Sequence, residues 1–450
     1  MSLDAACHDV PPELWFKIFR FAADLVDPAD FPCIEYLSPQ CCILPRLVRG
    51  SVRESLETKL ALASVCRRWN AMATPILYEH LTVPTRPVLG KLSRTLSSMR
   101  CGRGPFLSQF VKRLDFTTST SDGVLASLVI ELCRRAPNLV TLVIQLERSV
   151  NTTRLLNEIP RTLKHLHIQD HNDFRLSPEP QSSITLGQLA DFLDEHPNLI
   201  SISIPFVILK STTPPKPIVE AEADLPDELK NRRCRWPSIR KWTFQNPSQN
   251  CALAYYIPPH AFPNLEEVAF DQCANRTYNS RGVSGVEEFL SVHGEKVVVV
   301  GFTVGEDARP IGDDLQHVDR LCLRVKEVKV SLKSHGGMGC SSESWVGGAV
   351  KAIGSMQQIV SVGVRLCVTQ QDGGRTWNLH DAVAAPRWTE LFPNLERIKV
   401  LEEVDVEQYR RYDDSAHSTA EAPGMWASSP IPVEDILGNV LGEFYKGICT

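Results

Sequence analysis

Pro137-Asn-Leu-Val-Thr-Leu-Val-Ile144 contains the pattern that decides the fold. Its third, sixth and eighth residues are apolar, and a proline and an asparagine precede them. The same apolar-x-x-apolar-x-apolar signature occurs ten times between residues 101 and 400, at intervals of 24 to 40 residues. A period in this range is typical of repeat architectures, in which each unit buries its core against its neighbours. The ten copies are Val111/Leu114/Phe116, Leu139/Leu142/Ile144, Leu163/Leu166/Ile168, Leu199/Ile202/Ile204, Ile239/Trp242/Phe244, Leu265/Val268/Phe270, Val297/Val300/Phe302, Val325/Val328/Val330, Ile359/Val362/Val364 and Leu395/Ile398/Val400.

Apolar residues at helical spacing precede four of the copies, in the ranges 125–133, 186–193, 286–290 and 346–353. A helix, a turn and a short strand that recur in this order resemble the leucine-rich repeat. That family usually has an asparagine or cysteine three residues after the last apolar position, and here only Cys273 matches. The sequence therefore predicts an α/β repeat, an irregular leucine-rich-repeat-like solenoid over residues 101–400. The alternative is an α/β domain with a conventional parallel sheet.

Two segments near the N-terminus have more apolar surface than so short a chain can bury by itself. The first is Val10-Pro-Pro-Glu-Leu-Trp-Phe-Lys-Ile-Phe19, and the second runs from Leu60 to Pro75. Pro12 and Glu13 suit the first turn of a helix, where proline lacks only an unpaired amide and an acid meets the positive end of the dipole. The sequence predicts short helices here that bind a partner through an apolar surface.

The Pro-Pro-Glu-Leu opening and the later Val65-Cys-Arg-Arg-Trp69 together resemble the F-box over residues 9–80. Val10 replaces the usual leading leucine, and an insertion separates the two parts at about residues 24–58. Prolines such as Pro28, Pro32 and Pro39 predict a surface loop for that insertion. The resemblance implies docking on the Skp adaptor, and through it on a cullin, by Pro11, Pro12, Leu14, Ile18, Val65, Cys66 and Trp69.

The third and fifth positions of each repeat should turn away from the buried positions, because successive strand residues point to opposite faces. We expect them to be exposed on a concave face that binds a protein substrate. Their mixed charge implies neither an acidic nor a basic substrate. The alternative binding site is a long loop at about residues 205–235. The candidate substrate-binding residues are Arg113, His165, His167, Lys241, Glu267, Glu327, Lys329 and Arg397.

Composition excludes several classes of function. The net charge of −5 in 450 residues comes from the C-terminal stretch 401–450, which has 3 basic and 10 acidic residues. A near-neutral remainder argues against nucleic-acid binding. No apolar run is long enough for a signal peptide or a membrane span. The 14 cysteines form no C-x-x-C pair, as expected for reduced thiols in the cytoplasm or nucleus.

No catalytic or metal-binding constellation is evident, so we expect neither enzymatic activity nor a cofactor. His335-Gly-Gly-Met-Gly-Cys340 is similar to an esterase oxyanion loop, but no nucleophile elbow follows it. His165 and His167 on one strand face would lie about 7 Å apart, which is long for two ligands of one zinc ion. An exposed polar patch is the simpler interpretation of this pair.

Residues 401–450 should close the solenoid. Ile436, Leu437, Val440, Leu441 and Phe444 have helical spacing after Pro432, with Glu434 and Asp435 in the expected first turn. This helix should cap the last repeat, or else bind a partner. Together the segments predict the substrate-recognition subunit of an SCF-type ubiquitin ligase. A Skp-binding structural dock and an enzyme built from distant strands remain the alternatives.

Overall fold

The computed structural model of the chain describes residues 10–23, 46–83, 85–99, 105–116, 123–146, 152–170, 184–204, 207–208, 234–244, 257–271, 285–304, 309–334, 350, 354–368, 388–400 and 431–434. The chain divides into two compact units. The first holds residues 1–172, 177–184 and 191–203, and the second holds residues 173–176, 185–190 and 204–450. In the described residues, no helix is long and apolar enough to cross a membrane.

The first unit begins with three helices, α2 (Pro12–Ala22), α3 (Arg46–Val65) and α4 (Arg67–Glu79). Phe19 of α2 and Met72, Ala73 and Ile76 of α4 form their buried core. Helix α3 begins inside the range 24–58, so the predicted loop is wrong for residues 46–58. Those residues contain no proline, and nothing in them prevents the helix from extending backwards. Residues 24–45 lie outside the described ranges.

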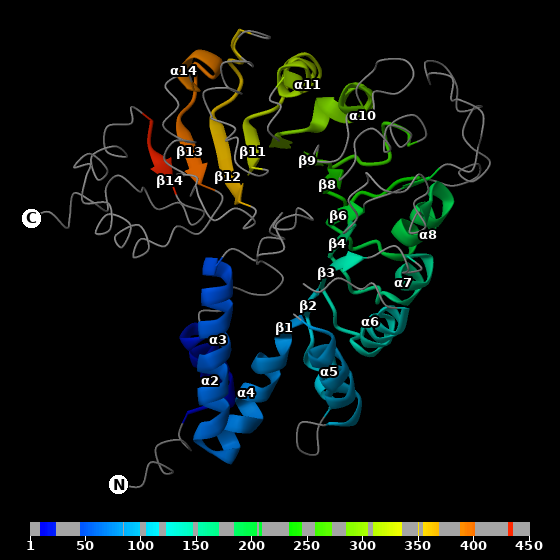
Figure 1. Cartoon of the computed structure of the whole chain (residues 1–450), viewed down its shortest axis with the longest axis vertical. Coiled ribbons are helices and arrows are strands. Elements are labelled where there is room, and N and C mark those ends of the chain that lie inside the picture. Colours follow the sequence, from blue (N-terminus) through cyan, green and yellow to red (C-terminus); the bar gives the residue numbers. More distant parts are fainter. Residues whose placement is uncertain are drawn as a thin grey trace, which may run out of the picture. The chain divides into compact units, whose positions relative to one another are not determined.

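The first unit continues as a parallel sheet with the strand order β1 (His80–Val83), β2 (Arg113–Phe116), β3 (Thr141–Leu146), β4 (His165–Asp170), β6 (Ser201–Ile204). The intervening helical segments are α5 (Arg86–Ser98), η1 (Leu107–Phe110), α6 (Gly123–Arg135) and α7 (Thr152–Glu158). Helix α8 (Leu186–Glu195) precedes β6, and the division between the two units falls within it. Figure 1 shows α5, α6 and α7 along one side of these strands. Two short strands, β5 (Ile184–Thr185) and β7 (Val207–Ile208), form a separate pair.

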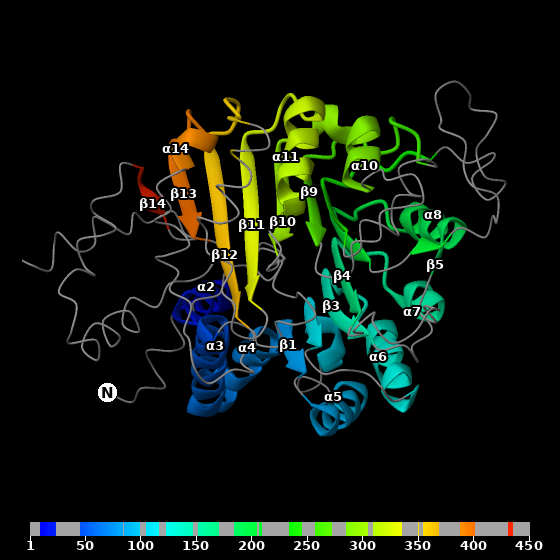
Figure 2. The ribbon, with the colours of Figure 1, turned by 45° about the horizontal axis from the view of Figure 1, so that its top comes forward.

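The second unit has the strand order β8 (Lys241–Phe244), β9 (Glu267–Asp271), β10 (Val299–Val304), β11 (Glu327–Ser334), β12 (Ser361–Val368), β13 (Arg397–Val400), β14 (Val433–Glu434), and each neighbouring pair in this order is parallel. Its helical segments are α10 (Gly285–His293), η4 (Gly294–Lys296), α11 (Arg309–Leu321) and α14 (Trp388–Leu391). In Figure 2 the helices α10, α11 and α14 lie on one side of the strands β9–β13.

All ten predicted copies are strands, and their middle residues are in register. Leu114 pairs with Leu142 and Leu142 with Leu166, while Val268, Val300 and Val328 form the corresponding row in the second unit. Within each unit the spatial order of the strands follows the chain order, which a strand-by-strand repeat produces. A leucine-rich-repeat-like α/β architecture with long parallel sheet segments is therefore confirmed. The strands β1 and β14 were not predicted.

Asparagines that directly follow a proline, at Pro137-Asn138, Pro263-Asn264 and Pro393-Asn394, connect neighbouring repeats. The Nδ2 atoms of Asn138, Asn264 and Asn394 donate to the carbonyl oxygens of Gln109, Pro237 and Gln357, at 2.7, 2.8 and 2.8 Å. Each acceptor lies 27 to 37 residues earlier, just before the preceding strand: Pro237 and Gln357 in turns, and Gln109 in the short helix η1. The Pro-Asn pairs thus have a physical role, because the amide satisfies a carbonyl that no strand or helix would pair.

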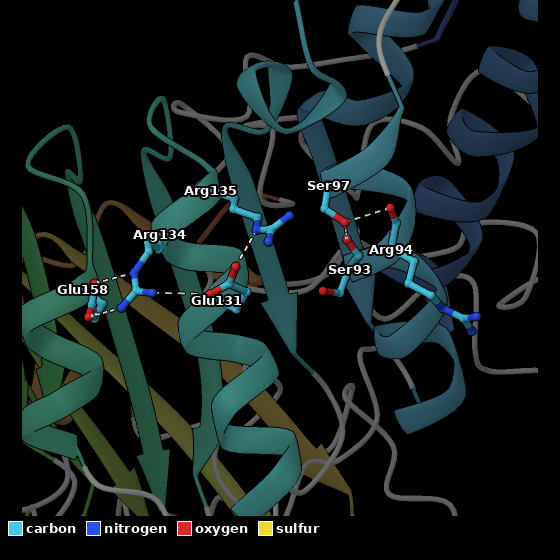
Figure 3. A network of polar contacts seen from close by, with 7 residues as sticks. All are labelled: Ser93, Arg94, Ser97, Glu131, Arg134, Arg135 and Glu158. Carbon is cyan, nitrogen blue, oxygen red and sulfur yellow. Dashed lines mark hydrogen bonds and ion pairs between the residues drawn. The ribbon is translucent and has the colours of Figure 1, made fainter.

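On the outer helices, ion pairs join neighbouring repeats. Arg134 of α6 contacts Glu158 of α7 and Glu131 of its own helix, and Arg135 also bonds Glu131 at 2.5 Å. Figure 3 shows this network beside Ser93, Arg94 and Ser97 of α5. These charges are exposed, so each pair contributes little to stability.

The C-terminal prediction needs correction. Val433 and Glu434 form the strand β14 beside β13, where the sequence predicted the first turn of a helix. Ile431 and Val433 are buried, and pairing with an open sheet edge outweighs the weak helical preference at these positions. Residues 435–450, 335–340 and 346–349, and most of the predicted loop 205–235, lie outside the described ranges.

Candidate protein-interaction surfaces

The N-terminal helices expose large apolar side chains. In the described residues nine large apolar side chains are exposed, and six of these are on α2 and α3. Buried apolar area is the main driving force of association, so such a concentration indicates an interaction site. The six residues, called here the exposed apolar set, are Leu14 (48% exposed), Ile18 (47%), Phe21 (89%), Leu56 (43%), Leu60 (49%) and Val65 (61%).

Helical spacing places part of this set on one face. Leu14, Ile18 and Phe21 follow one another at i, i+4 and i+7 along α2. Trp15 and Phe19, on the opposite side of that helix, pack into the core with Trp69. Helix α2 therefore has two apolar faces. One face completes the module, and the other is available to a partner.

The seven predicted adaptor-binding residues divide into two groups. Pro11, Pro12, Leu14, Ile18 and Val65 are exposed. Cys66 and Trp69 are half-buried and hold the helices together. The Sγ atom of Cys66 accepts a hydrogen bond from the Trp69 amide at 3.4 Å and caps α4. The ring of Trp69 lies 5.0 Å from that of Trp15 and 4.9 Å from that of Phe19, centroid to centroid.

A buried carboxylate at the end of α4 ties these helices to the first repeat strands. The Oε1 atom of Glu79 lies 2.5 Å from Nη2 of Arg20 on α2 and 3.2 Å from Nζ of Lys112, just before β2. The Lys112 amide also donates to the Glu79 carbonyl at 2.9 Å. Burial lowers the pKa of Lys59 on α3 to about 8, although Glu79 partly opposes this shift. Glu79 thus couples all three helices to the repeat.

In the first unit, His80, Arg113 and Asp115 form a cluster on the sheet face opposite the apolar row. The Nε2 atom of His80 lies 2.7 Å from Oδ2 of Asp115, and Nε of Arg113 donates to Oδ1 and Oδ2 at 2.9 and 3.0 Å. Burial alone would raise the pKa of Asp115. The charges and hydrogen bonds of Arg113 and His80 outweigh burial and lower the pKa to about 2.

The predicted exposure of this face is wrong for Arg113 and His167, which are buried, and His165 is half-buried. Neighbouring strands lie about 4.8 Å apart, so side chains in one register row cover each other. His165 stands between Thr141 and Ser201 in such a row. Where the structure describes the chain, no group of three or more His, Cys, Asp or Glu residues could hold a metal ion.

In the second unit, Glu267 of β9 joins two lysines. Its Oε1 atom accepts hydrogen bonds from Nζ of Lys241 at 3.0 Å and from Nζ of Lys329 at 2.6 Å. Lys329 is on β11, so its side chain reaches across β10 to Glu267. All three predicted residues are half-buried. The structure thus brings these three residues together, and their charged groups bond one another.

A glycine lies beneath each long lysine contact. Gly301 is the register partner of Lys329 on the strand that its side chain crosses. Lys399 of β13 reaches Glu327 of β11 at 2.8 Å, and the strand between them has Gly363 in register with Lys399. A Cβ on Gly301 would lie 3.0 Å from the Cβ of Ala269. Glycine thus leaves space on the crossed strand.

The predicted adaptor-binding set omitted Phe21, Leu56 and Leu60, although Leu60 opens the second apolar segment that the sequence analysis expected to bind a partner. Phe21 shares the helical spacing of Leu14 and Ile18, so its position was available from the pattern. Leu56 fell in the segment predicted as a loop, which hid its relation to Leu60 on the same helix. Strand β1 was also not predicted. It follows α4 without an intervening turn, and within it only Leu81 and Val83 show the alternation of apolar residues that indicates a strand.

Comparisons with known proteins give structural similarities only. A scan against protein families and a search of curated proteins find no match. Among solved structures, the leucine-rich repeat-containing protein LegL7 from Legionella pneumophila is similar at 9% identity and a TM-score of 0.36, over 82% of this chain and 89% of that chain. A protein from Bacteroides fragilis is similar at 12% identity and a TM-score of 0.31, over 58% of this chain and 70% of that chain. Similarities of this size say nothing of function.

Proposed function

We propose that this protein is the substrate-recognition subunit of an SCF-type ubiquitin ligase. The helices α2–α4 would dock on the Skp adaptor, and the repeat sheet would hold a protein substrate. The chain itself would carry out no chemistry. It would act by position, because a substrate tethered near the transferring enzyme is present at a high effective concentration.

The exposed apolar set supports this proposal most directly. Five of the seven residues that the F-box resemblance assigns to the adaptor are exposed, and Leu14, Ile18 and Val65 also belong to this set. Leaving so much apolar surface in water is unfavourable by roughly 25 cal/mol per Å². A partner that covers α2 and α3 would recover this free energy. The core formed by Phe19, Met72 and Ile76 lets the helices keep their shape without that partner.

Co-purification of the full chain with the Skp adaptor and cullin tests the proposal. Replacing Leu14 and Ile18 by alanine should cost roughly 2 kcal/mol or more each in adaptor binding, if they anchor the interface. Val88→Ala on α5 is a matched control, since Val88 is also exposed but lies outside the three helices. Undiminished adaptor capture by a folded Leu14→Ala/Ile18→Ala variant would refute the proposal.

The second candidate is a structural dock that binds the adaptor without ubiquitin transfer. The same exposed apolar set supports it, because apolar docking does not require a cullin. Recovery of the adaptor together with cullin supports the ligase, and recovery of the adaptor alone supports the dock. Recovery of neither would favour another scaffold or an enzymatic role for the repeat region.

A further inference from the structure

The sheet face of the second unit that carries Lys241 and Glu267 has an uneven pairing of charges. The lysines at positions 241 and 329 bond Glu267, and Lys399 bonds Glu327. Arg397 of β13 is half-buried on the same face and, among the described residues, has no carboxylate within ion-pair distance. Its Nε atom is buried and has no hydrogen-bond partner there. An unpaired buried donor of a charged group is unfavourable, so this position calls for an acceptor.

A second donor without a partner lies next to it. Ser361 on β12 is the register partner of Arg397, the residue is only 2% exposed, and its Oγ atom has no hydrogen-bond partner in the described part of the chain. Lys399, two residues beyond Arg397, adds a cation that already shares Glu327. Glu434 on β14 is in register with Lys399, and no ion pair joins it to Arg397. The two adjacent groups without partners are therefore a guanidinium and a hydroxyl.

We propose that Arg397 and Ser361 form a binding position for a carboxylate, supplied by an Asp or Glu side chain of an extended protein segment on this face. This proposal rests on the proposed function, in which the sheet holds a protein substrate, and it adds the chemical class of one substrate residue. Guanidinium and carboxylate match in shape and charge, and their paired hydrogen bonds are among the stronger ones in proteins.

An extended protein segment fits this face better than a free small anion. Phe289 of α10 packs against Phe270 of β9, so the apolar positions of these strands face the helices that Figure 2 shows along β9–β13. Alternation along β13 turns Arg397 to the opposite face. Among the cations of this face whose side chains the structure describes, the lysines at positions 241, 329 and 399 are held by Glu267 and Glu327, and Arg397 has no carboxylate partner. A charge at one end of a half-buried polar row would fix the register of a bound chain, whereas a free anion would have only the contacts to Arg397 and Ser361 and therefore weak affinity.

Peptide binding to the full-length protein tests the proposal. The probe is an array of random peptides about twelve residues long, with paired copies in which each Asp and Glu is replaced by Asn and Gln. We expect bound peptides to contain an acidic residue and to lose about tenfold or more in affinity when that residue becomes an amide. Arg397→Gln should remove this difference, Arg397→Lys should retain part of it, and Ser361→Ala should reduce it. Arg324→Gln, an exposed arginine in the turn before β11, is the control and should leave it unchanged.

Three outcomes would overturn the carboxylate position: no peptide bound by the wild-type protein, equal binding of acidic and amide peptides, or full discrimination by Arg397→Gln. If free acetate or phosphate displaced the acidic peptides as effectively as an unlabelled acidic peptide does, the position would be assigned to a free anion. Adaptor capture is measured on the same variants. The Leu14→Ala/Ile18→Ala variant is included in this measurement. If it loses adaptor capture while the peptides show no discrimination, the proposed adaptor docking stands and only the carboxylate position is refuted.

Discussion

At the scale of single residues, paired charges determine the behaviour of the sheet faces. Asp115 is buried, yet its two oxygens contact Arg113 and His80, so the ionised form is the stable one. Lys241, Glu267 and Lys329 form a comparable group in the second unit. Reversing the charges of both Lys241 and Glu267, a natural test of substrate binding, would place a lysine beside Lys329. That variant would therefore report on stability as well as on binding.

Replacing Asp115 by asparagine should destabilise the first unit by about 3 kcal/mol or more at neutral pH, because Arg113 would lose its buried partner. The pKa of Asp115 in the folded state is about 2, below the ordinary value of 3.8 for an aspartate. The stabilisation is therefore present above pH 4 and is lost as the pH falls from about 4 to 2. Denaturant unfolding of both proteins across this range would measure it.

The exposed pair of Arg134 and Glu158 supplies the control for this experiment (Figure 3). Glu158→Gln should change stability little at any pH, because solvent screens exposed pairs. An equal loss of stability in Asp115→Asn and Glu158→Gln, or a difference between Asp115→Asn and wild type that persists at pH 2, would contradict the assigned role of Asp115.

Gly301 gives a second prediction at this scale. Its replacement by alanine should destabilise the second unit by about 1 kcal/mol, because the new Cβ would lie 3.0 Å from that of Ala269. Ala269→Gly in the same protein should restore most of the loss. Thermal unfolding of the two single variants and the double variant measures the coupling. Additive losses would show that crowding against Ala269 is not the cause.

At the scale of elements, the sequence pattern predicted strands better than it predicted their neighbours. All ten apolar signatures are strands. The last two apolar residues of each signature are two positions apart, so a strand places both on the same buried face. The start of α3 at Arg46 could not be predicted, since the upstream prolines suggested a loop through residue 58. Strand β14 has only two residues, too few for any periodic signal, and tertiary pairing decides its conformation.

The candidate site was less predictable for a related reason. Helical spacing indicated the exposed row of Leu14 and Ile18, but alternation along a strand gives only the direction of a side chain. Whether Arg113 or His167 is covered depends on the neighbouring strands, whose side chains the pattern of one strand does not specify. Contacts such as that of Lys329 with Glu267 span 62 residues and two strands, so they became visible only in the fold.

The two faces of α2 should respond differently to truncation. Leu14→Ala/Ile18→Ala should weaken adaptor binding. It should change the free energy of unfolding by less than about 1 kcal/mol relative to wild type, because both residues are about half exposed to solvent. Phe19→Ala should lower stability by about 3 kcal/mol or more, since its ring is fully buried. Parallel melting curves and adaptor pull-downs separate the two effects. A strongly destabilised Leu14→Ala/Ile18→Ala variant would mean that this face belongs to the core.

The strand β14 should be required for the stability of the second unit. A chain that ends at residue 430 loses the buried Ile431 and Val433 and exposes the edge of β13, so its melting temperature should fall. A chain that ends at residue 434 keeps β14 and is the matched control. If both chains melt at the same lowered temperature, residues beyond 434 supply the stabilisation, as the predicted capping helix would.

At the scale of the whole molecule, the proposed function would require the helices α2–α4 to be fixed to the repeats. Within the first unit, Glu79 provides such a link, because one carboxylate contacts Arg20 of α2 and Lys112 at the start of β2. The apolar cluster that contains Phe19 and Trp69 holds the helices to each other, and its members are all residues of these helices. Docking and rigidity should therefore depend on different residues.

Replacing Glu79 by glutamine should loosen this link without removing the docking surface. Amide hydrogen exchange should rise together in α2 and in the β1–β2 strands, because both lose the same buried charge, while affinity for the adaptor stays within about twofold of wild type. In the wild-type protein the charge of Glu79 partly opposes the effect of burial on Lys59. Without that charge the pKa of Lys59 should fall below about 8. Glu57→Gln, an exposed acid on α3, is the control. Faster exchange in α2 alone, with the strands unchanged, would show that Glu79 stabilises the helices but does not couple them to the repeat.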